Sequence, residues 1–598
     1  MNGDASLELG VIGNCIISAL IDREARIVWS CLPRFDGDPV FHALIDDAED
    51  AAATGFWSIE LAGCRRSEQE YLGNTAVLAT RLFAEDGSAI EIVDFCPRFE
   101  LRGRSFRPQT LVRRVRAIAG TPRIQVRVRP SFGYGAQKPE VTHGSNHIRY
   151  VGADRVLRLT TDAPISFLLA ETAFLLEGSA NFLLGADESL TGGIEQTARE
   201  FHEETASYWS QWARRLALPP EWQEAVIRAA ITLKLCTFEE TGAIVAAMTT
   251  SIPEAPGTSR NWDYRYCWLR DAYFVVRALN SLSAVGTMEN YLRYIGNIVG
   301  AAPGGHLQPV YGIALERRLE ESEVPTLAGY RGMGPVRVGN QAYGHLQHDV
   351  YGNVVLAAAQ SFYDRRLLRP ATQQDFERLE RVGEQAFQVY ATPDASMWEL
   401  RTRERVHTSS ALMCWAACDR LGRIAAHLGI GARAALWHER ADAIRAAIEQ
   451  HAWDGKRGSF VDSFGGGDVE AGLLLMAEVG FLPADDARFT GTVAEVERRL
   501  RRGKHLFRYA AADDFGVPST AFNICTFWYI DALARMGRIE EARELFEHML
   551  ACRNRLGLLS EDIHPETGEL WGNYPQTYSM VGVINAATRL SGSWKDLI

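Results

Sequence analysis

The chain has 598 residues, longer than most single domains, so we expect two or more hydrophobic cores. Hydrophobic residues make up 47% and charged residues 23%, as is usual for a globular protein. Its 63 Lys and Arg against 75 Asp and Glu residues give a net charge of −12 without a long basic run, which argues against a nucleic-acid partner.

Cysteine spacing and apolar runs indicate the compartment. The ten cysteines are dispersed and none forms a CxxC pair, which speaks against a zinc knuckle or a thioredoxin-like motif. The apolar stretch 9–21 follows Asp4 and Glu8 rather than basic residues, and it is too short to cross a membrane. We therefore expect a cytoplasmic protein without membrane contact, whose partner is a small molecule. The oligomeric state stays open.

The first third of the chain predicts short strands separated by Gly, Pro, Asp or Asn. In segment 123–129 apolar and polar residues alternate, with Ile124, Val126 and Val128 on one face, as in a half-buried antiparallel strand. Many such strands at regular spacing favour an antiparallel β-sandwich over residues 1–190. The other segments of this kind are 26–32, 55–61, 76–83, 90–95, 111–118 and 156–161.

Helices follow the strands. Aromatic residues recur at helical spacing over 194–216, and Pro219 and Pro220 then end this segment, so residues 191–220 predict a linker helix. From residue 221 onward about twelve helical segments, 469–479 among them, alternate with loops rich in Gly, Pro and aromatic residues. This pattern suits a closed ring of helical hairpins, an (α/α)6 barrel, over residues 221–598.

Three predicted loops place charged side chains beside aromatic ones. They are Asn-Trp-Asp-Tyr-Arg-Tyr-Cys-Trp-Leu-Arg-Asp at 261–271, Met-Trp-Glu-Leu at 397–400, and Gly-Leu-Leu-Ser-Glu-Asp-Ile at 557–563, which Trp-Gly-Asn-Tyr-Pro-Gln follows at 571–576. Charged groups in such loops are candidates for a functional site.

Each of these residues also has a purely structural interpretation. A single glutamate usually solvates a surface, Trp268 could be a core residue, and Arg270 with Asp271 could form an ion pair at a helix start. Neither an HExxH motif nor a carboxylate cluster accompanies the histidines, so we expect no metal site and no cofactor; the histidines considered are His306, His345, His348 and His564.

With these loops the chain resembles the glucoamylase and trehalase glycoside hydrolases, family fifteen, in its bacterial trehalase-like branch. The pattern Asn261-x-Asp-Tyr-x-Tyr-x-Trp-x-Arg-Asp271 is similar to the glucose-binding loop of that family. Trp398-Glu399 resembles the motif with the general acid, and Ser560-Glu561 the motif with the general base. The fold of the family is a β-sandwich followed by an (α/α)6 barrel, which agrees with the elements expected above.

The resemblance implies an inverting, exo-acting hydrolase that releases β-glucose from a small α-glucoside. In such enzymes one carboxyl group protonates the glycosidic oxygen and a second activates water. Glu399 matches the acid, with Trp398 beside it to exclude water from the carboxyl group, and Glu561 matches the base. The substrate-binding residues implied by the resemblance are Tyr264, Trp268, Arg270, Asp271, Arg337 and Trp398.

The substrate is open at this stage. α,α-Trehalose is the first choice, because the N-terminal third resembles the trehalase-like members and neither a starch-binding module nor an export signal is evident. A glucoamylase acting on malto- or isomalto-oligosaccharides is the alternative. A phosphorylase would need a phosphate pocket in place of the base, and a carbohydrate-binding protein without activity would not need both glutamates, so Ser560-Glu561 argues against both.

Overall fold

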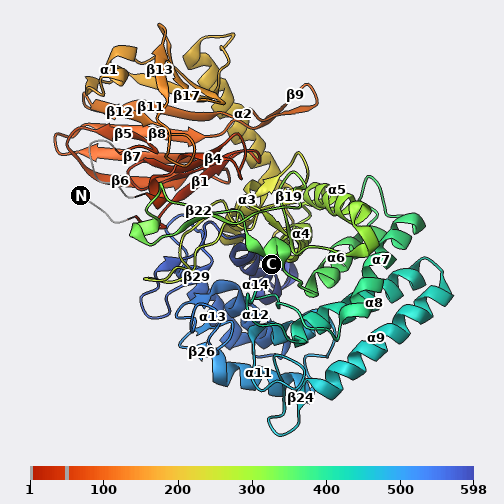
Figure 1. The fold of residues 1–598 in the computed structure, drawn as a ribbon. Coiled ribbons are helices and arrows are strands. Elements are labelled where there is room, and N and C mark those ends of the chain that lie inside the picture. Colours follow the sequence, from red (N-terminus) through yellow and green to blue (C-terminus); the bar gives the residue numbers. More distant parts are fainter. Residues whose placement is uncertain (1–4, 47–52, 598) are drawn as a thin grey trace.

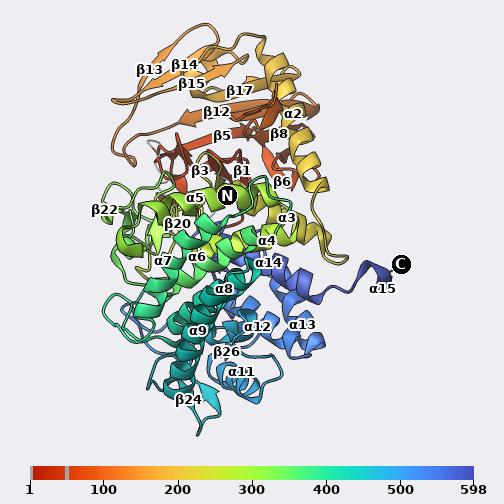
Figure 2. The ribbon, with the colours of Figure 1, turned by 90° about the vertical axis from the view of Figure 1, so that its right-hand side faces the viewer.

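The computed structural model describes residues 5–46 and 53–597. Strands dominate the chain up to residue 186, and helices dominate from residue 194 onward. In both views of the ribbon the strands form a separate layered body that lies against one side of the helical body (Figures 1 and 2). The predicted fold class, a β-sandwich followed by a helical barrel, is confirmed.

The sandwich consists of two antiparallel sheets. The first contains, in spatial order, β1 (Gly10–Gly13), β2 (Ser18–Ile21), β3 (Ile27–Leu32), β5 (Phe56–Leu61), β12 (Arg123–Arg129) and β16 (Phe174–Leu175), with β4 (Asp38–Phe41) beside β3. The second contains β13 (Glu140–His143), β14 (His147–Val151), β15 (Val156–Thr161), β17 (Ser179–Ala186), β11 (Leu111–Ala119), β8 (Ala89–Phe95), β7 (Leu78–Ala84) and β6 (Cys64–Tyr71).

The alternating pattern of β12 has the expected result. Ile124 and Val126 are buried and Val128 is half-buried, all on the face that packs into the sandwich. A small hairpin, β9 (Phe99–Leu101) with β10 (Arg104–Phe106), and a short helix, α1 (Ile165–Leu169), complete this part. The long helix α2 (Ile194–Arg214) then packs along β17 and β9 and buries Trp209.

Twelve helices form the barrel within the described part of 221–598. They are α3 (Gln223–Leu235), α4 (Leu269–Ser281), α5 (Val285–Ala301), α6 (Asp349–Ala359), α7 (Gln373–Val389), α8 (Thr408–His427), α9 (Gly431–His451), α10 (Leu475–Glu478), α11 (Ala487–Leu500), α12 (Asn523–Arg535), α13 (Ile539–Ala551) and α14 (Thr577–Leu590). No helix in the described residues is both apolar enough and long enough to span a bilayer.

The even-numbered helices form the inner ring. α4 packs on α6, α6 on α8, α12 on both α10 and α14, and α14 returns to α4, so that the ring closes. Between α8 and α10 the contact passes through a 3-10 turn, Ala471–Leu474. The expected helix 469–479 is therefore this turn followed directly by α10, and it starts only after Glu470, whose backbone is extended and whose side chain points to Trp398.

Candidate active site

One pocket brings together the site residues expected from the sequence, except Arg337. The lining comes from loops that lead into inner helices: 261–268 before α4, 397–401 before α8, and 561–576 before α14. Residues remote in sequence therefore meet at the ends of neighbouring helices. The expected residues in the lining are Tyr264, Trp268, Arg270, Asp271, Trp398, Glu399 and Glu561.

Glu561 is held rigidly on one wall. It directly precedes β29 (Asp562–Ile563), which pairs with β30 (Leu570–Trp571), and its side chain is 2% exposed. The hydroxyl group of Tyr264 donates to its Oε1 at 2.7 Å. Its Oε2 is buried and accepts no hydrogen bond from the described residues. Gly572 lies so close that a Cβ atom there would be 2.8 Å from Oε2, which leaves the carboxyl group no room to turn in that direction.

A cluster of buried charges surrounds Glu561. Burial raises its pKa well above the usual range, and the carboxylates of Glu254 and Asp562 add to this effect, while Tyr264 and Arg508 oppose it. Burial and Glu254 also raise the pKa of Asp562, to about 8. An ionised Glu561 in this setting is a stronger base than an ordinary carboxylate.

Glu399, unlike Glu561, lies in a strained turn. Its φ of 61° lies in the left-handed region, which a non-glycine residue rarely adopts and which often marks a functional site. The turn closes through a bond from the Glu399 N–H to the Ser396 carbonyl at 3.1 Å. Asp394 anchors it by accepting from the N–H of Ser396 and from the hydroxyl group of Ser410.

The indole of Trp268 connects the two glutamates. Its N–H donates to Glu399 Oε1 at 2.5 Å. The ring of Tyr264, whose hydroxyl group binds Glu561, packs edge-on against the same indole with centroids 5.3 Å apart. A chain of contacts thus runs from one carboxyl group to the other, across the pocket that both of them line.

Arg270 and Asp271 form the charged floor beside Glu399. Their side chains pair at 3.1 Å, and Arg270 also donates to the Met397 carbonyl at 2.9 Å and lies 3.7 Å from Glu399. Burial raises the pKa of Asp271 to about 6, against the influence of Arg270. Such a pair offers rigid, charge-assisted hydrogen bonds to hydroxyl groups.

Trp398 and Arg337 make contacts that could not be expected from the sequence motifs. The indole N–H of Trp398 donates to Glu470, whose pKa burial raises to about 8. Arg337 is ion-paired with Glu321 at 3.1 Å and lies over the ring of Trp262, a residue of the pocket wall. Its side chain is not part of the lining itself.

Several pocket residues were missed by the motif comparison. Arg508 pairs with Glu254, and Arg260 binds Asp513 at 2.6 Å. These pairs join the segment before residue 261 to the loop 508–515. The only sequence signal for that loop was its composition, Arg-Tyr-Ala-Ala-Ala-Asp-Asp-Phe, with paired acids next to aromatic residues. The missed residues are Glu254, Arg260, Trp262, Arg508, Tyr509, Asp513 and Phe515.

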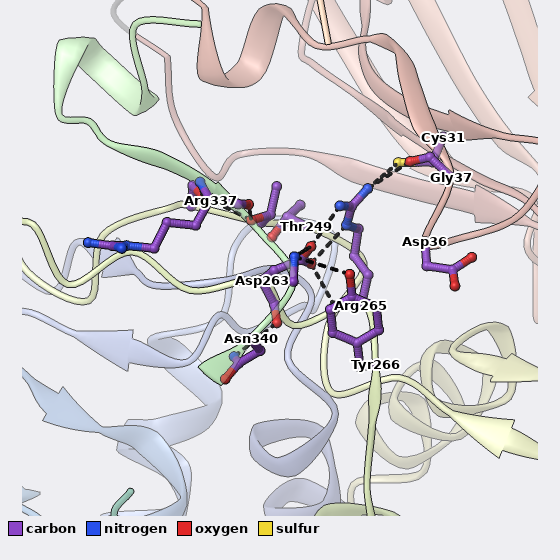
Figure 3. A network of polar contacts seen from close by, with 12 residues as sticks. Cys31, Asp36, Gly37, Thr249, Asp263, Arg265, Tyr266, Arg337 and Asn340 are labelled. Carbon is purple, nitrogen blue, oxygen red and sulfur yellow. Dashed lines mark hydrogen bonds and ion pairs between the residues drawn. The ribbon is translucent and has the colours of Figure 1, made fainter. Parts of the chain in front are cut away.

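The loop 261–271 also has a second face, which holds the barrel to the sandwich (Figure 3). Arg265 and Asp263 are fully buried and pair at 2.7 Å. Arg265 also donates to the carbonyl of Gly37 at 2.8 Å and to the hydroxyl group of Tyr134 at 2.9 Å, both in the sandwich. Alternate residues of one loop thus face the pocket and the domain junction.

A closed helical barrel with carboxyl groups, aromatic rings and an Arg–Asp pair in one pocket has the features of a glycoside hydrolase. The model for glycosyl hydrolases family 15 matches residues 221–588, and the model for the trehalase-like N-terminal domain matches residues 6–172. The chain belongs to glycosyl hydrolases family 15 and is a glycoside hydrolase. The resemblance seen in the motifs is confirmed.

The relatives cover nearly the whole chain. A protein named trehalase from Thermoplasma volcanium is 31% identical over 594 residues, 97% of this chain and 93% of that protein. A protein named trehalase from Mycobacterium tuberculosis is 32% identical over 604 residues, 96% of this chain and 88% of that protein. A bacterial glucoamylase solved with acarbose superposes with a TM-score of 0.71 at 12% identity, covering 98% of this chain and 94% of its own, and so shares the fold.

Proposed function

We propose that the enzyme hydrolyses α,α-trehalose with inversion and releases one β-glucose and one α-glucose. The substrate assignment rests on the relatives named trehalase, which match over nearly the whole chain, and on the trehalase-like N-terminal domain. The mechanism rests on one observation: two glutamates from distant loops line a single pocket, each held by a different member of the Tyr264–Trp268 pair.

Glu399 is the proposed general acid. Its Oε1 already accepts the Trp268 N–H and lies 3.7 Å from Arg270, so the proton that it delivers is carried by Oε2. As the bond between the anomeric carbon and the glycosidic oxygen breaks, this proton passes to that oxygen, and the second glucose leaves as a neutral molecule.

Glu561 is the proposed general base. Its Oε1 accepts from Tyr264, whereas its buried Oε2 accepts no hydrogen bond from the described residues, and we assign Oε2 to the catalytic water. This oxygen takes one proton from the water as the water oxygen bonds to the anomeric carbon from the face opposite the leaving group. The buried surroundings make the ionised carboxylate basic enough for this step.

The first glucose needs partners for its hydroxyl groups and a flat apolar surface. We assign the hydroxyl groups to Arg270 and Asp271, and the apolar contact to Trp268, because these side chains border Glu399 in the pocket. Trp398 forms the adjoining wall. In this proposal Arg337 does not contact the glucose; it acts through its guanidinium group, which lies over the ring of Trp262.

Product analysis tests the proposal. Purified enzyme is incubated with trehalose, maltose, isomaltose and maltotriose, and released glucose is measured. We expect the highest kcat/KM for trehalose, and proton NMR at early times should show equal amounts of α- and β-glucose. A preference for maltotriose would instead assign a glucoamylase, and an all-α first product would exclude inversion.

Two variants separate the roles of the glutamates. Glu399→Gln should lose trehalose hydrolysis but retain more activity on α-glucosyl fluoride, because a good leaving group scarcely needs an acid. Glu561→Gln should be slow on both substrates, since water attack is impaired in either case. General acid–base catalysis contributes about 10²–10⁴-fold, so we expect losses of this order. Equal behaviour of the two variants would contradict the assignment.

We also propose residues 1–190, 191–220 and 221–598 as the sandwich, linker and catalytic units, and the cytoplasm as the location. The ten cysteines support the location, because they occur as free thiols and most of them are buried.

A further inference from the structure

A cluster of metal-ligand side chains lies outside the pocket, where the hairpin β26–β27 (Arg501–Arg502 and His505–Leu506) meets α13. His505 belongs to β27, His548 to the last turn of α13, and Cys552 directly follows that helix. The Nε2 atoms of the two histidines are 3.2 Å apart, and the Cys552 sulfur is 3.6 Å from His548 Nε2. All three ligand atoms lie within 4.8 Å of one another.

The distances from His548 Nε2 to the other two ligand atoms are close to those expected around a tetrahedral metal ion. With metal–nitrogen bonds of about 2.0–2.1 Å and metal–sulfur bonds of about 2.3 Å, tetrahedral angles place two nitrogens about 3.3–3.4 Å apart and a nitrogen about 3.5–3.6 Å from a sulfur. We propose that His505, His548 and Cys552 bind one Zn²⁺ or a similar borderline-soft divalent ion, through Nε2, Nε2 and Sγ.

Hydrogen bonds among the three side chains explain their close approach less well than a bound metal ion does. A neutral imidazole nitrogen offers either one proton or one lone pair. His548 Nε2 faces both His505 Nε2 and the Cys552 sulfur, so it cannot satisfy both neighbours at their present distances. A cation at the centre accepts one lone pair from each of the three atoms.

The burial of the three side chains and the charges around them are compatible with a metal ion bound by three residues. His505 is 3% exposed, whereas His548 and Cys552 are half-buried, so solvent can supply a water molecule as the fourth ligand. Lys504, which precedes His505 in the chain, is paired with Glu544 at 2.9 Å, and this pairing reduces its repulsion of an incoming ion. On binding, the Cys552 thiol releases its proton to solvent and the sulfur binds as thiolate.

A metal ion at this site would fix the start of a loop that lines the pocket. His505 lies three residues before Arg508, where the loop 508–515 begins. Arg508, Asp513 and Phe515 of this loop line the pocket. A metal ion would link the start of this loop to α13. The bond from the Leu506 N–H to Thr526 at 3.0 Å already links it to α12. Metal bound only by the folded state raises its stability.

Metal binding to the full-length protein tests the proposal without any substrate. After dialysis against a chelator, Zn²⁺ titration by calorimetry should give one site per chain, and Zn²⁺ should raise the Tm. Co²⁺ alone should produce the sulfur-to-cobalt charge-transfer absorption of a thiolate-bound ion. Cys552→Ser should remove this absorption, and Cys552→Ser and His548→Gln should each weaken Zn²⁺ binding by at least about tenfold.

Cys64→Ser is the matched control, because Cys64 is also a half-exposed free thiol but lies in the sandwich. It should leave binding and absorption unchanged. Circular dichroism without metal establishes that each variant is folded. Absence of the charge-transfer absorption in the unmodified protein would overturn the proposal whatever the variants do. Unchanged Zn²⁺ affinity in both ligand variants would do so as well.

Discussion

The backbone of Gly572 lies directly against the side chain of the proposed base, Glu561. Its φ of 76° favours glycine, and a Cβ atom there would be 2.6 Å from the Glu561 Cβ. We therefore expect Gly572→Ala to displace the Glu561 carboxyl group. Since a displacement of about 1 Å can cost 10²-fold in rate, kcat should fall by about that factor, measured by glucose release from trehalose.

Gly568→Ala is the control for the backbone effect. Gly568 lies in the connection between β29 and β30, just before the strand that Gly572 follows, and it has a similar φ of 73°, but nothing lies within 4 Å of a Cβ atom there. The substitution should cost some stability and leave kcat nearly unchanged. If Gly572→Ala and Gly568→Ala reduce kcat equally, the contact with Glu561 is not the cause.

Glu254 is expected to set the acid side of the pH profile through Glu561. Among the charges near Glu561 its carboxylate raises the pKa most, after burial itself. Glu254→Gln removes this negative charge, which favours the ionised form of Glu561 and lowers its pKa. The acid limb of kcat/KM for trehalose should move to lower pH.

Glu60→Gln, far from the pocket in β5, provides the reference profile. An acid limb that stays in place or moves to higher pH in Glu254→Gln would contradict the coupling between the two carboxyl groups.

The motifs identified the residues at the centre of the pocket but not its outer wall. Glu399, Glu561 and the loop 261–271 were found because each places a charge next to apolar or aromatic side chains within a short segment that resembles a family motif. Arg508 and Asp513 could not be found in this way, because their partners Glu254 and Arg260 are far away in the sequence. Only the folded chain brings these charges together.

At the scale of elements, the loop 261–271 couples the pocket to the domain junction. Arg265→Met should destabilise the protein, because it leaves Asp263 buried without its cation. Loss of one partner of a buried pair costs about 3–5 kcal/mol, which urea unfolding can measure.

Arg34→Met is the matched control at the same junction. Arg34 pairs with Glu316 of the barrel at 3.0 Å and with its neighbour Asp36 at 2.8 Å, but its side chain is 33% exposed. Exposed pairs contribute about 0–1 kcal/mol, so this variant should unfold close to the unmodified protein. Equal losses in Arg34→Met and Arg265→Met would show that burial of the pair does not matter.

One strand that was not predicted from the sequence, β6, lacks a local hydrophobic pattern. β6 reads Cys-Arg-Arg-Ser-Glu-Gln-Glu-Tyr and is largely exposed, because it is an edge strand whose charged side chains face solvent. Its place in the sheet depends on pairing with β7, which composition does not reveal. The apolar segment 469–479, in contrast, is helical over residues 471–478, as expected, and only its start differs, because the backbone of the buried Glu470 is extended.

For the whole molecule, Glu239 joins sandwich to barrel. It accepts from Arg98, which follows β8, at 2.7 Å, and from Lys234 of α3. Burial alone would raise the pKa of Glu239, but Lys234 and Arg98 overcome this and hold it well below the ordinary 4.5. A depressed pKa contributes stability that is fully present above the unfolded value and is lost as pH falls toward the folded value.

Glu239→Gln should therefore destabilise the protein most at neutral pH, by about 3–5 kcal/mol, because two buried cations lose their counter-charge. The difference from the unmodified protein should shrink below about pH 4.5, measured by urea unfolding across a pH series. Glu240→Gln, at the exposed neighbouring position, should show no such trend. A difference independent of pH would show that the charge of Glu239 is not responsible.

Closure of the ring by the last long helix has a consequence for synthesis. The pocket lining begins at Ala246 and ends at Tyr578 in α14, and α14 is also the helix that packs back on α4. While the ribosome is still translating, the inner faces of α4, α6 and α8 are complete but have no α14 to close over them. We therefore expect the nascent chain to have no finished catalytic centre, and to expose the apolar inner faces of these helices, until α14 has been translated. We expect a premature stop before α14 to abolish activity and solubility together.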